Sequence, residues 1–127
     1  MTPVLIDSSA WIHFLRNSEQ KTADAVERAI ADDRAVITGP VIAELLRGVR
    51  DESQARQLRD LLEVVRREEV YPRDWNECGL TMCRLRRRGI TVPLTDALIA
   101  TVAVRCELPV LTLDTHFQHL PAKLVEI

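Results

Sequence analysis

The chain has 127 residues and a mass of 14.4 kDa, the size of a single domain with one hydrophobic core, and we expect one domain over residues 1–127. Its 17 Lys and Arg against 19 Asp and Glu give a formal net charge of −2. Taken alone, this balance argues against a simple basic nucleic-acid-binding domain. The hydrophobic content of 46% argues against intrinsic disorder.

The sequence also lacks the features of membrane and secreted proteins. No apolar run approaches the roughly 18 residues of a membrane span, and the N-terminus has no basic region of the kind that opens a signal peptide. The three cysteines form no CxxC pair and are interpreted as reduced, mostly buried thiols. We therefore expect a cytoplasmic protein that makes no membrane contact.

Short apolar runs alternate along the chain with apolar residues at helical spacing. In chain order, these patterns predict a strand at 3–6, helices at 8–15 and 23–32, a strand at 35–38, helices from 39 onward and at 55–65, a strand at 69–71, helices at 75–85 and 96–106, a strand at 109–113 and a last edge strand at 124–127. This alternation predicts an α/β fold with a mainly parallel sheet of four to five strands and helices on both faces.

Four acidic residues stand beside apolar segments, unlike most of the 19 acids. Asp7 and Asp114 each end a predicted strand, whereas Glu44 and Asp96 lie near the starts of predicted helices. Ligands of open parallel sheets bind outside the carboxyl ends of the strands, so we expect these four acids at one rim. Buried carboxylates are costly unless they are paired or bind a metal, and a hard divalent cation such as Mg²⁺ or Mn²⁺ is the simplest remedy.

Each of these acids also has a plainer interpretation when taken singly. Asp7 and Asp96 could be helix N-caps, Asp114 could belong to a turn, and Glu44 could be solvated. The predicted core face of the helix that carries Glu44 consists of Ile42, Leu46 and Val49. The joint placement of the four acids favours a functional site over these separate explanations.

The four acidic segments together resemble the PIN domain family, and more closely its VapC-type toxin ribonucleases. The matching segments are residues 5–11 (LIDSSAW), 40–48 (PVIAELLRG), 93–100 (PLTDALIA) and 111–117 (LTLDTHF). The resemblance covers essentially the whole chain, in order. It implies a PIN-like fold and an endoribonuclease that depends on one or two Mg²⁺ or Mn²⁺ ions, with Asp7, Glu44, Asp96 and Asp114 as its metal-binding and catalytic carboxylates.

In such an enzyme, a metal-activated water would attack the phosphorus atom of an RNA, possible substrates being a tRNA or a ribosomal RNA loop. Asp7, Asp96 and Asp114 would be the principal metal anchors, and Glu44 would bind the metal through water or orient the attacking water.

The resemblance also assigns supporting roles around the acids. Ser9 and Thr112 match positions whose hydroxyl groups help to order the site. Many relatives carry a further acid two residues beyond the position of Asp114, where this chain has His116. This departure either weakens a second metal site or gives the site a neutral-to-cationic neighbour.

One dense basic run lies at the end of the predicted helix before Asp96. Arg84, Arg86, Arg87 and Arg88 could contact RNA phosphates that lead into the site, or could be solvated cations that stabilise a helix C-terminus. Arg47, shortly after Glu44, is a further candidate for RNA contact.

Toxins of this type imply two protein partners, a second copy of the chain in a homodimer and a VapB-type antitoxin. The antitoxin would place an apolar segment against the early helices and the long helical hairpin. Trp11, Leu15, Leu58 and Leu62 therefore line a partner groove or pack in the core.

Three other functions compete with the ribonuclease hypothesis. A receiver domain would need an acidic pair after the first strand, and a haloacid-dehalogenase-like phosphatase would need Asp-x-Asp there, whereas this chain has Asp7-Ser8-Ser9. The serious alternative is a catalytically silent PIN module that binds RNA or protein without cutting.

Overall fold

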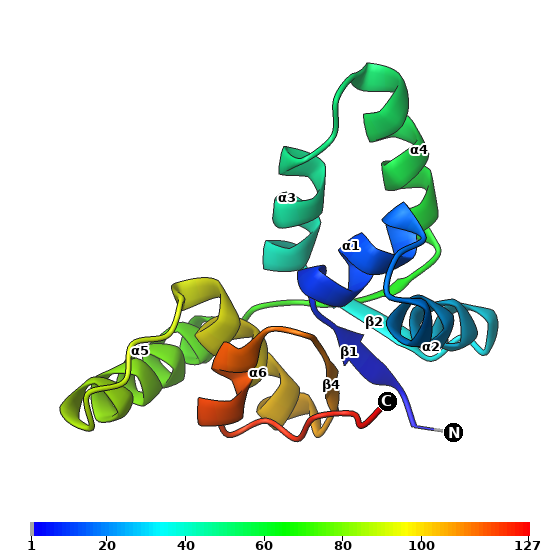
Figure 1. Ribbon diagram of the computed structural model, residues 1–127. Coiled ribbons are helices and arrows are strands. Elements are labelled where there is room, and N and C mark those ends of the chain that lie inside the picture. Colours follow the sequence, from blue (N-terminus) through cyan, green and yellow to red (C-terminus); the bar gives the residue numbers. More distant parts are fainter. Residues whose placement is uncertain (1) are drawn as a thin grey trace.

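The structure is a computed structural model that describes residues 2–127 and contains one parallel sheet flanked by helices (Figure 1). The strand order is β3-β2-β1-β4, and every pairing is parallel. The strands are β1 (Val4–Ile6), β2 (Ala35–Thr38), β3 (Arg66–Glu68) and β4 (Val110–Leu111). The predicted α/β fold with a parallel sheet is confirmed, at the lower of the two expected strand numbers.

Helices connect these strands and cover both faces of the sheet. They are α1 (Ser8–Arg16), α2 (Gln20–Ala31), α3 (Gly39–Arg47), α4 (Glu52–Glu63), α5 (Pro72–Arg87) and α6 (Leu94–Cys106), followed by the short 3₁₀ helix η1 (Thr115–His119). In Figure 1, α1 and α2 lie on one side of the sheet, α5 and α6 lie on the other, and α3 and α4 form a hairpin that extends away from it. Within residues 2–127, no helix is long and apolar enough to cross a bilayer.

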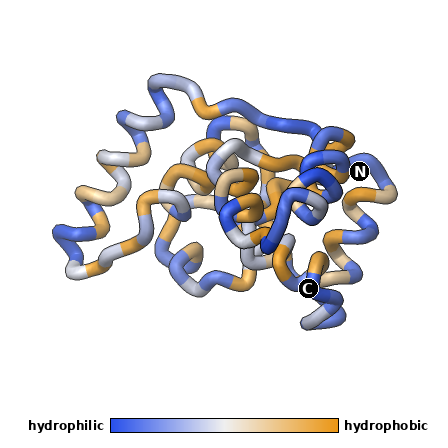
Figure 2. Tube along the Cα trace, turned by 90° about the horizontal axis from the view of Figure 1, so that it is seen from above, coloured by the Kyte–Doolittle hydropathy of each residue, from blue (hydrophilic) through white to orange (hydrophobic). Residues whose placement is uncertain are grey.

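The central strands are buried along their whole length, as expected when helices cover both faces of a parallel sheet. Figure 2 shows the same arrangement along the chain, since the hydrophobic segments gather in the middle of the molecule and the hydrophilic ones lie mostly outside. The largest fully buried side chains include Trp11, Leu5, Ile37 and Phe117.

The third strand lies three residues earlier than predicted. It is formed by Arg66–Glu68, which pair with β2, and not by residues 69–71. An edge strand needs backbone pairing on one side only, so two exposed arginines are tolerated there, and charged side chains also protect a sheet edge. Hydrophobicity was therefore the wrong signal for this strand.

The predicted strand at 124–127 is reduced to a single parallel bridge between Leu124 and Val110. Its neighbour β4 has only two residues, because the chain leaves the sheet at Thr112. The prediction of a strand over residues 109–113 was accordingly too long.

The buried faces of two helices differ from what their apolar residues suggest. In α5, Cys78 and Leu85 are buried, but Trp75 is 52% exposed and Asp74 takes the inward position. In α3 the buried residues are Val41 and Leu45, whereas the predicted residues Ile42, Leu46 and Val49 are only partly buried against the core.

Asp74 is buried because it forms a paired contact with Arg105 of α6. The Arg105 Nε lies 2.9 Å from Asp74 Oδ1 and an Nη lies 3.0 Å from Oδ2, and the same guanidinium donates to the carbonyl of Glu69 and stacks on the Tyr71 ring. Burial alone would raise the pKa of Asp74, but the hydrogen bonds from Arg105 and from the Tyr71 N–H hold it below its ordinary value. This pair joins α5 to α6.

The Arg105→Ala variant should lose about 3 kcal/mol of folding free energy, because it leaves the Asp74 carboxylate buried without its cation. Arg84→Ala is the matched control, since Arg84 forms only an exposed ion pair with Glu77 and should cost less than about 0.5 kcal/mol. Urea unfolding of the two variants measures both values. Equal midpoints for the two variants would contradict the structural role of Arg105.

Candidate metal centre

Three acids meet where β1 and β4 end and α6 begins. Asp7 directly follows β1, Asp114 comes three residues after β4, and Asp96 is the third residue of α6. Because β1 and β4 are neighbouring parallel strands, their carboxyl ends open at the same edge of the sheet, where ligands of such sheets bind.

Asp7 is fixed by two hydroxyl groups and keeps one oxygen free. Its Oδ2 accepts hydrogen bonds from Ser9 Oγ and Thr112 Oγ1, both at 2.9 Å. Its Oδ1 is buried without a hydrogen-bond partner among residues 2–127, and the residue as a whole is 2% exposed. Asp7 does stand at the N-cap position of α1, but its side chain makes no capping bond, so helix capping does not account for it.

The same two hydroxyl groups hold the segment after β4 against the segment after β1. Ser9 Oγ and Thr112 Oγ1 lie 3.1 Å apart. The backbone N–H of Leu113 donates to Ser9 Oγ, and that of Asp114 donates to Thr112 Oγ1, each at 3.0 Å. Through this network the position of Asp114 is set relative to Asp7.

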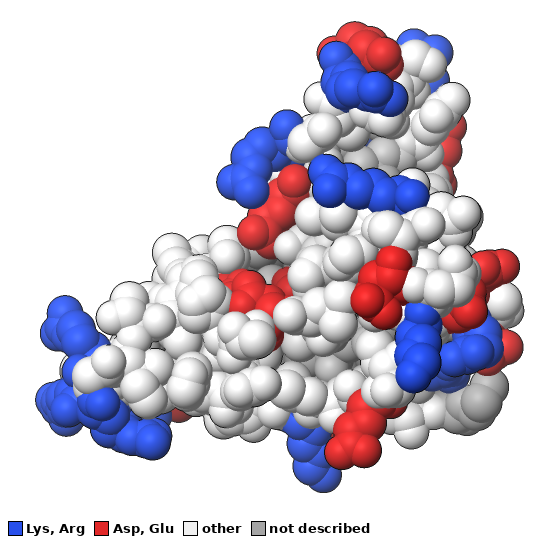
Figure 3. Space-filling model, in the orientation of Figure 1, with Lys and Arg blue, Asp and Glu red and all other residues white. Residues whose placement is uncertain are grey.

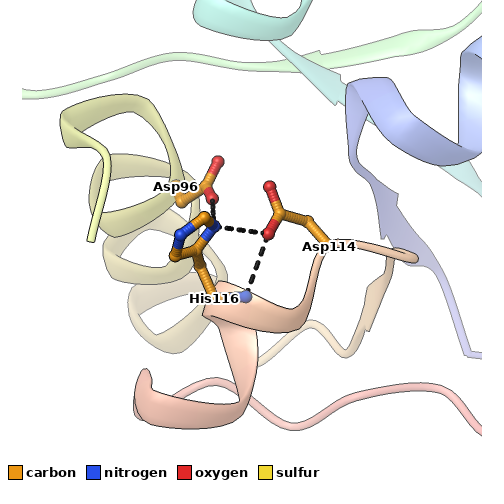
Figure 4. A group of neighbouring side chains, drawn as sticks. All are labelled: Asp96, Asp114 and His116. Atoms are coloured by element: carbon orange, nitrogen blue, oxygen red, sulfur yellow. Dashed lines mark hydrogen bonds and ion pairs between the residues drawn. The ribbon is translucent and has the colours of Figure 1, made fainter. Parts of the chain in front are cut away.

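Asp96, Asp114 and His116 form a tighter group, drawn in Figure 4, in which one potential ligand atom from each lies within 4.8 Å of the others. His116 Nδ1 lies 2.6 Å from Asp114 Oδ1 and 3.6 Å from Asp96 Oδ2. Asp96 is 6% exposed, and its Oδ2 has no hydrogen-bond partner in the described chain. The N-cap of α6 is Pro93, so the interpretation of Asp96 as an N-cap was wrong.

The pKa values of Asp96 and Asp114 are shifted in opposite directions. Burial raises the pKa of Asp96 to about 7, reinforced by its hydrogen bond with Asp114 and by the charges of Asp114 and Asp7. Burial also acts to raise the pKa of Asp114, but hydrogen bonds from the His116 backbone and ring and from Asp96 lower it below its ordinary value. Asp96 is therefore only partly ionised near neutral pH, in a place where a bound cation would favour its charged form.

Glu44 stands somewhat apart from this group. It is half-buried on α3, and its Oε1 is buried without a partner in the part of the chain that the structure describes. It lines a cavity of about 390 Å³ between α1, α3 and α4, together with Ile12, Leu15 and Leu58. The structure thus places Glu44 at the wall of a groove and not within the group of Asp96, Asp114 and His116.

The arginines that were predicted to contact RNA lie away from Asp96, Asp114 and His116. Arg84, Arg86, Arg87 and Arg88 are all exposed at or just beyond the C-terminal end of α5. Figure 3 shows acidic side chains in a hollow near the middle of this face, and basic side chains at the far end of α5, with uncharged surface between them. Arg47 is exposed at the last position of α3.

The donor set fits a hard divalent cation. Buried oxygens of Asp7 and Asp96 have no hydrogen-bond partner within residues 2–127, and unpaired buried carboxylates are strongly unfavourable unless a cation compensates them. Carboxylate oxygens are the ligands that Mg²⁺ and Mn²⁺ prefer. Asp7, Asp96 and Asp114 are the residues that would hold such an ion.

Comparison with known proteins agrees with this geometry. The family model described as the PIN domain matches residues 4–123, so the chain belongs to the PIN domain family, and the resemblance stated from the sequence is confirmed.

Among curated proteins, the chain is similar to VapC ribonuclease Mb1587 of Mycobacterium bovis and to ribonuclease VapC11 of Mycobacterium tuberculosis. Each is 30% identical over 106 residues, which cover 80% of this chain and 79% of the relative.

Solved structures share the fold at lower identity. VapBC-1 from nontypeable Haemophilus influenzae has a TM-score of 0.81 at 21% identity, and VapBC2 from Rickettsia felis, bound to a DNA fragment from its promoter, has a TM-score of 0.80 at 17%. In both comparisons 98% of each chain is covered.

Asp96→Asn should stabilise the ion-free protein above pH 7 by about 1 to 2 kcal/mol, a discounted share of 1.36 kcal/mol per pKa unit. The reason is that a raised carboxyl pKa makes the folded state less stable as pH rises from 3.8 through about 7. Thermal unfolding at pH 8 in a chelator measures the change.

Adding Mn²⁺ should then raise the unfolding temperature of the wild type but not of Asp96→Asn, because ligands stabilise the state that binds them. Asp60→Asn, at an exposed position of α4, is the control and should follow the wild type in both conditions. If the ion-free Asp96→Asn variant were less stable than the wild type, the ionised Asp96 carboxylate would not be unfavourable in the folded protein, contrary to its raised pKa.

Proposed function

We propose that this chain is a VapC-type toxin, a Mg²⁺- or Mn²⁺-dependent endoribonuclease of a toxin-antitoxin system that acts in the cytoplasm. The observation that carries the proposal is the placement of Asp7, Asp96 and Asp114 at one sheet edge, where buried oxygens of Asp7 and Asp96 find no hydrogen-bond partner among the described residues. Similarity to named VapC ribonucleases supports RNA as the substrate, and a tRNA or a ribosomal RNA loop suits the open hollow.

Each residue of the site has a part in the reaction that we propose. When bound, the cation supplies a water of lowered pKa and neutralises charge on the phosphate. Asp7, Asp96 and Asp114 hold it, and Ser9 and Thr112 keep Asp7 in its orientation. Glu44, which has one buried oxygen without a hydrogen-bond partner in the described part of the chain, orients the attacking water or binds the ion through water.

Contacts with RNA beyond the cut phosphate are assigned to arginines. Arg47 lies one turn after Glu44 on α3, and it is the basic candidate on the same helix as a site acid. Arg84, Arg86, Arg87 and Arg88 stand at the far end of α5, so they would contact RNA outside the hollow. Arginine suits this role because its guanidinium binds phosphate through two hydrogen bonds.

The antitoxin is proposed to bind in the groove between α1, α3 and α4. Leu15 is 44% exposed at this groove and is free to contact an apolar segment. Leu58 is largely buried but lines the same cavity, whereas Trp11 and Leu62 pack in the core. The named structural relatives are VapBC complexes, which supports a VapB-type partner for this chain.

A homodimer is also proposed. Its support is two large apolar side chains of α5, Trp75 and Leu80, which are both about half exposed. Such side chains are common where a second chain covers them.

The Asp7→Asn variant should remove cleavage of RNA, with a loss of at least about a hundredfold, because it takes away an anchor of the ion without changing the volume of the side chain. Asp60→Asn should keep the wild-type rate. Chelation should stop the wild type, and Mn²⁺ should restore it. The rate of RNA cleavage by the purified proteins measures each effect, and circular dichroism checks that the variants are folded.

The same proteins expressed in cells test the toxin role. The wild type should arrest growth and produce new RNA 5′ ends, and Asp7→Asn should do neither. Inactivity of the wild type with every divalent metal would favour the alternative, a catalytically silent PIN module that binds RNA or protein. Wild-type cleavage by Asp7→Asn would show that the assignment of the site is wrong.

A further inference from the structure

His116 is the one nitrogen donor in the group that it forms with Asp96 and Asp114. Its Nδ1 is turned toward both carboxylates, 2.6 Å from Asp114 and 3.6 Å from Asp96, and Figure 4 shows the other ring nitrogen pointing away from them. We propose that His116 Nδ1 is a ligand of the ion, so that this site has mixed oxygen and nitrogen donors and binds Mn²⁺ in preference to Mg²⁺. The inference rests on the proposed metal site.

The position of the ring is set by the local fold. The backbone N–H of His116 donates to the same Asp114 Oδ1, at 2.9 Å, and Asp114 is the N-cap of η1. The next residue, Phe117, is fully buried and anchors the 3₁₀ turn in the core. The 3₁₀ turn is therefore fixed by the Asp114 cap on one side of His116 and by buried Phe117 on the other. This turn holds the imidazole beside the carboxylates.

A second observation points to a ligand at this place. Asp96 Oδ2, the oxygen 3.6 Å from the imidazole, is buried and lacks a hydrogen-bond partner in the described residues. Asp7 Oδ1 is in the same condition. Asp96, Asp114 and His116 thus form a partial set of ligand atoms in which the Asp96 oxygen nearest the imidazole is left unsatisfied, an arrangement that a cation completes.

The nature of the donors decides which ion is preferred. Mg²⁺ favours oxygen ligands and retains several waters, whereas imidazole is a good ligand for first-row transition metals. Exchanging one carboxylate for an imidazole therefore weakens Mg²⁺ more than Mn²⁺. The exchange also removes one negative charge from the ligand set. The preference for one ion over the other then depends more on the type of ligand atom than on the total charge of the site.

Binding of the ion requires the lone pair of Nδ1. In the ion-free protein, the 2.6 Å contact between Nδ1 and Asp114 is a hydrogen bond and so contains a proton. On coordination that proton is displaced from Nδ1, and the imidazole binds as the neutral tautomer that carries its single N–H proton on Nε2. No bond to carbon is made or broken and no redox change occurs.

Pulsed electron paramagnetic resonance of the Mn²⁺-loaded full chain tests the inference without RNA. A ¹⁴N modulation from a directly bound imidazole is expected for the wild type and for His119→Ala, the control in the same 3₁₀ helix. The modulation should be lost in His116→Ala. Because His116 is exposed on its outer side, this variant is expected to fold, which circular dichroism checks.

Competition between the two ions provides a second readout. His116→Asp restores an all-carboxylate set, so the ratio of Mn²⁺ to Mg²⁺ affinity should fall by about tenfold or more, the scale of change seen when groups around a metal are altered. Isothermal titration with Mn²⁺ and Mg²⁺ measures this ratio in the wild type and in His116→Asp.

The outcomes separate this inference from the proposed function. Stoichiometric Mn²⁺ binding without a ¹⁴N modulation in the wild type, or an unchanged affinity ratio in His116→Asp, would overturn the role of His116 while leaving the ribonuclease proposal intact. Absence of Mn²⁺ binding would overturn both. A ¹⁴N signal in a protein that cuts no RNA would support the metal ligand and contradict the ribonuclease.

Discussion

The mutual repulsion of carboxylates at one sheet edge is the constraint on which the site depends. Asp7, Asp96 and Asp114 come from three separate elements, yet they lie so close that burial, a hydrogen bond with Asp114 and the charges of Asp114 and Asp7 together raise the pKa of Asp96. A fold selected for stability alone would not bring these groups together in a buried place. Such strain indicates a ligand, since opposing charge from a cation changes the repulsion into attraction.

The surrounding structure can be understood as the frame that holds these groups in place. Strand β4 has only two residues because Thr112 leaves the sheet to bond Asp7. Its hydroxyl group and that of Ser9 then join segments 103 residues apart in the chain. The order of the sheet makes this possible, since β1 lies directly beside β4. Because β1 and β4 are neighbours, Ser9 and Thr112 lie within hydrogen-bond distance of each other although they are 103 residues apart in the chain.

Features that depend on residues adjacent in the chain could be predicted from the sequence. Asp7 and Asp114 could be identified because each follows an apolar strand, and parallel topology then predicts that they share an edge. Strand β3 was misplaced because its charged residues are held by backbone pairing to β2, which leaves no trace in hydropathy. Asp74 was missed because its partner Arg105 lies 31 residues further along the chain, and only the packing of α5 on α6 reveals the pair.

The acidic balance of the chain has a local explanation. The formal charge of −2 includes the three carboxylates of Asp7, Asp96 and Asp114, while exposed arginines occupy the ends of α3 and α5. An RNA phosphate entering the hollow meets repulsion unless a cation is present, so the same ion that would activate water also makes approach of the substrate favourable. Net charge is therefore a poor guide to nucleic-acid binding when the acids are metal ligands, because the ion supplies the positive charge that the composition lacks.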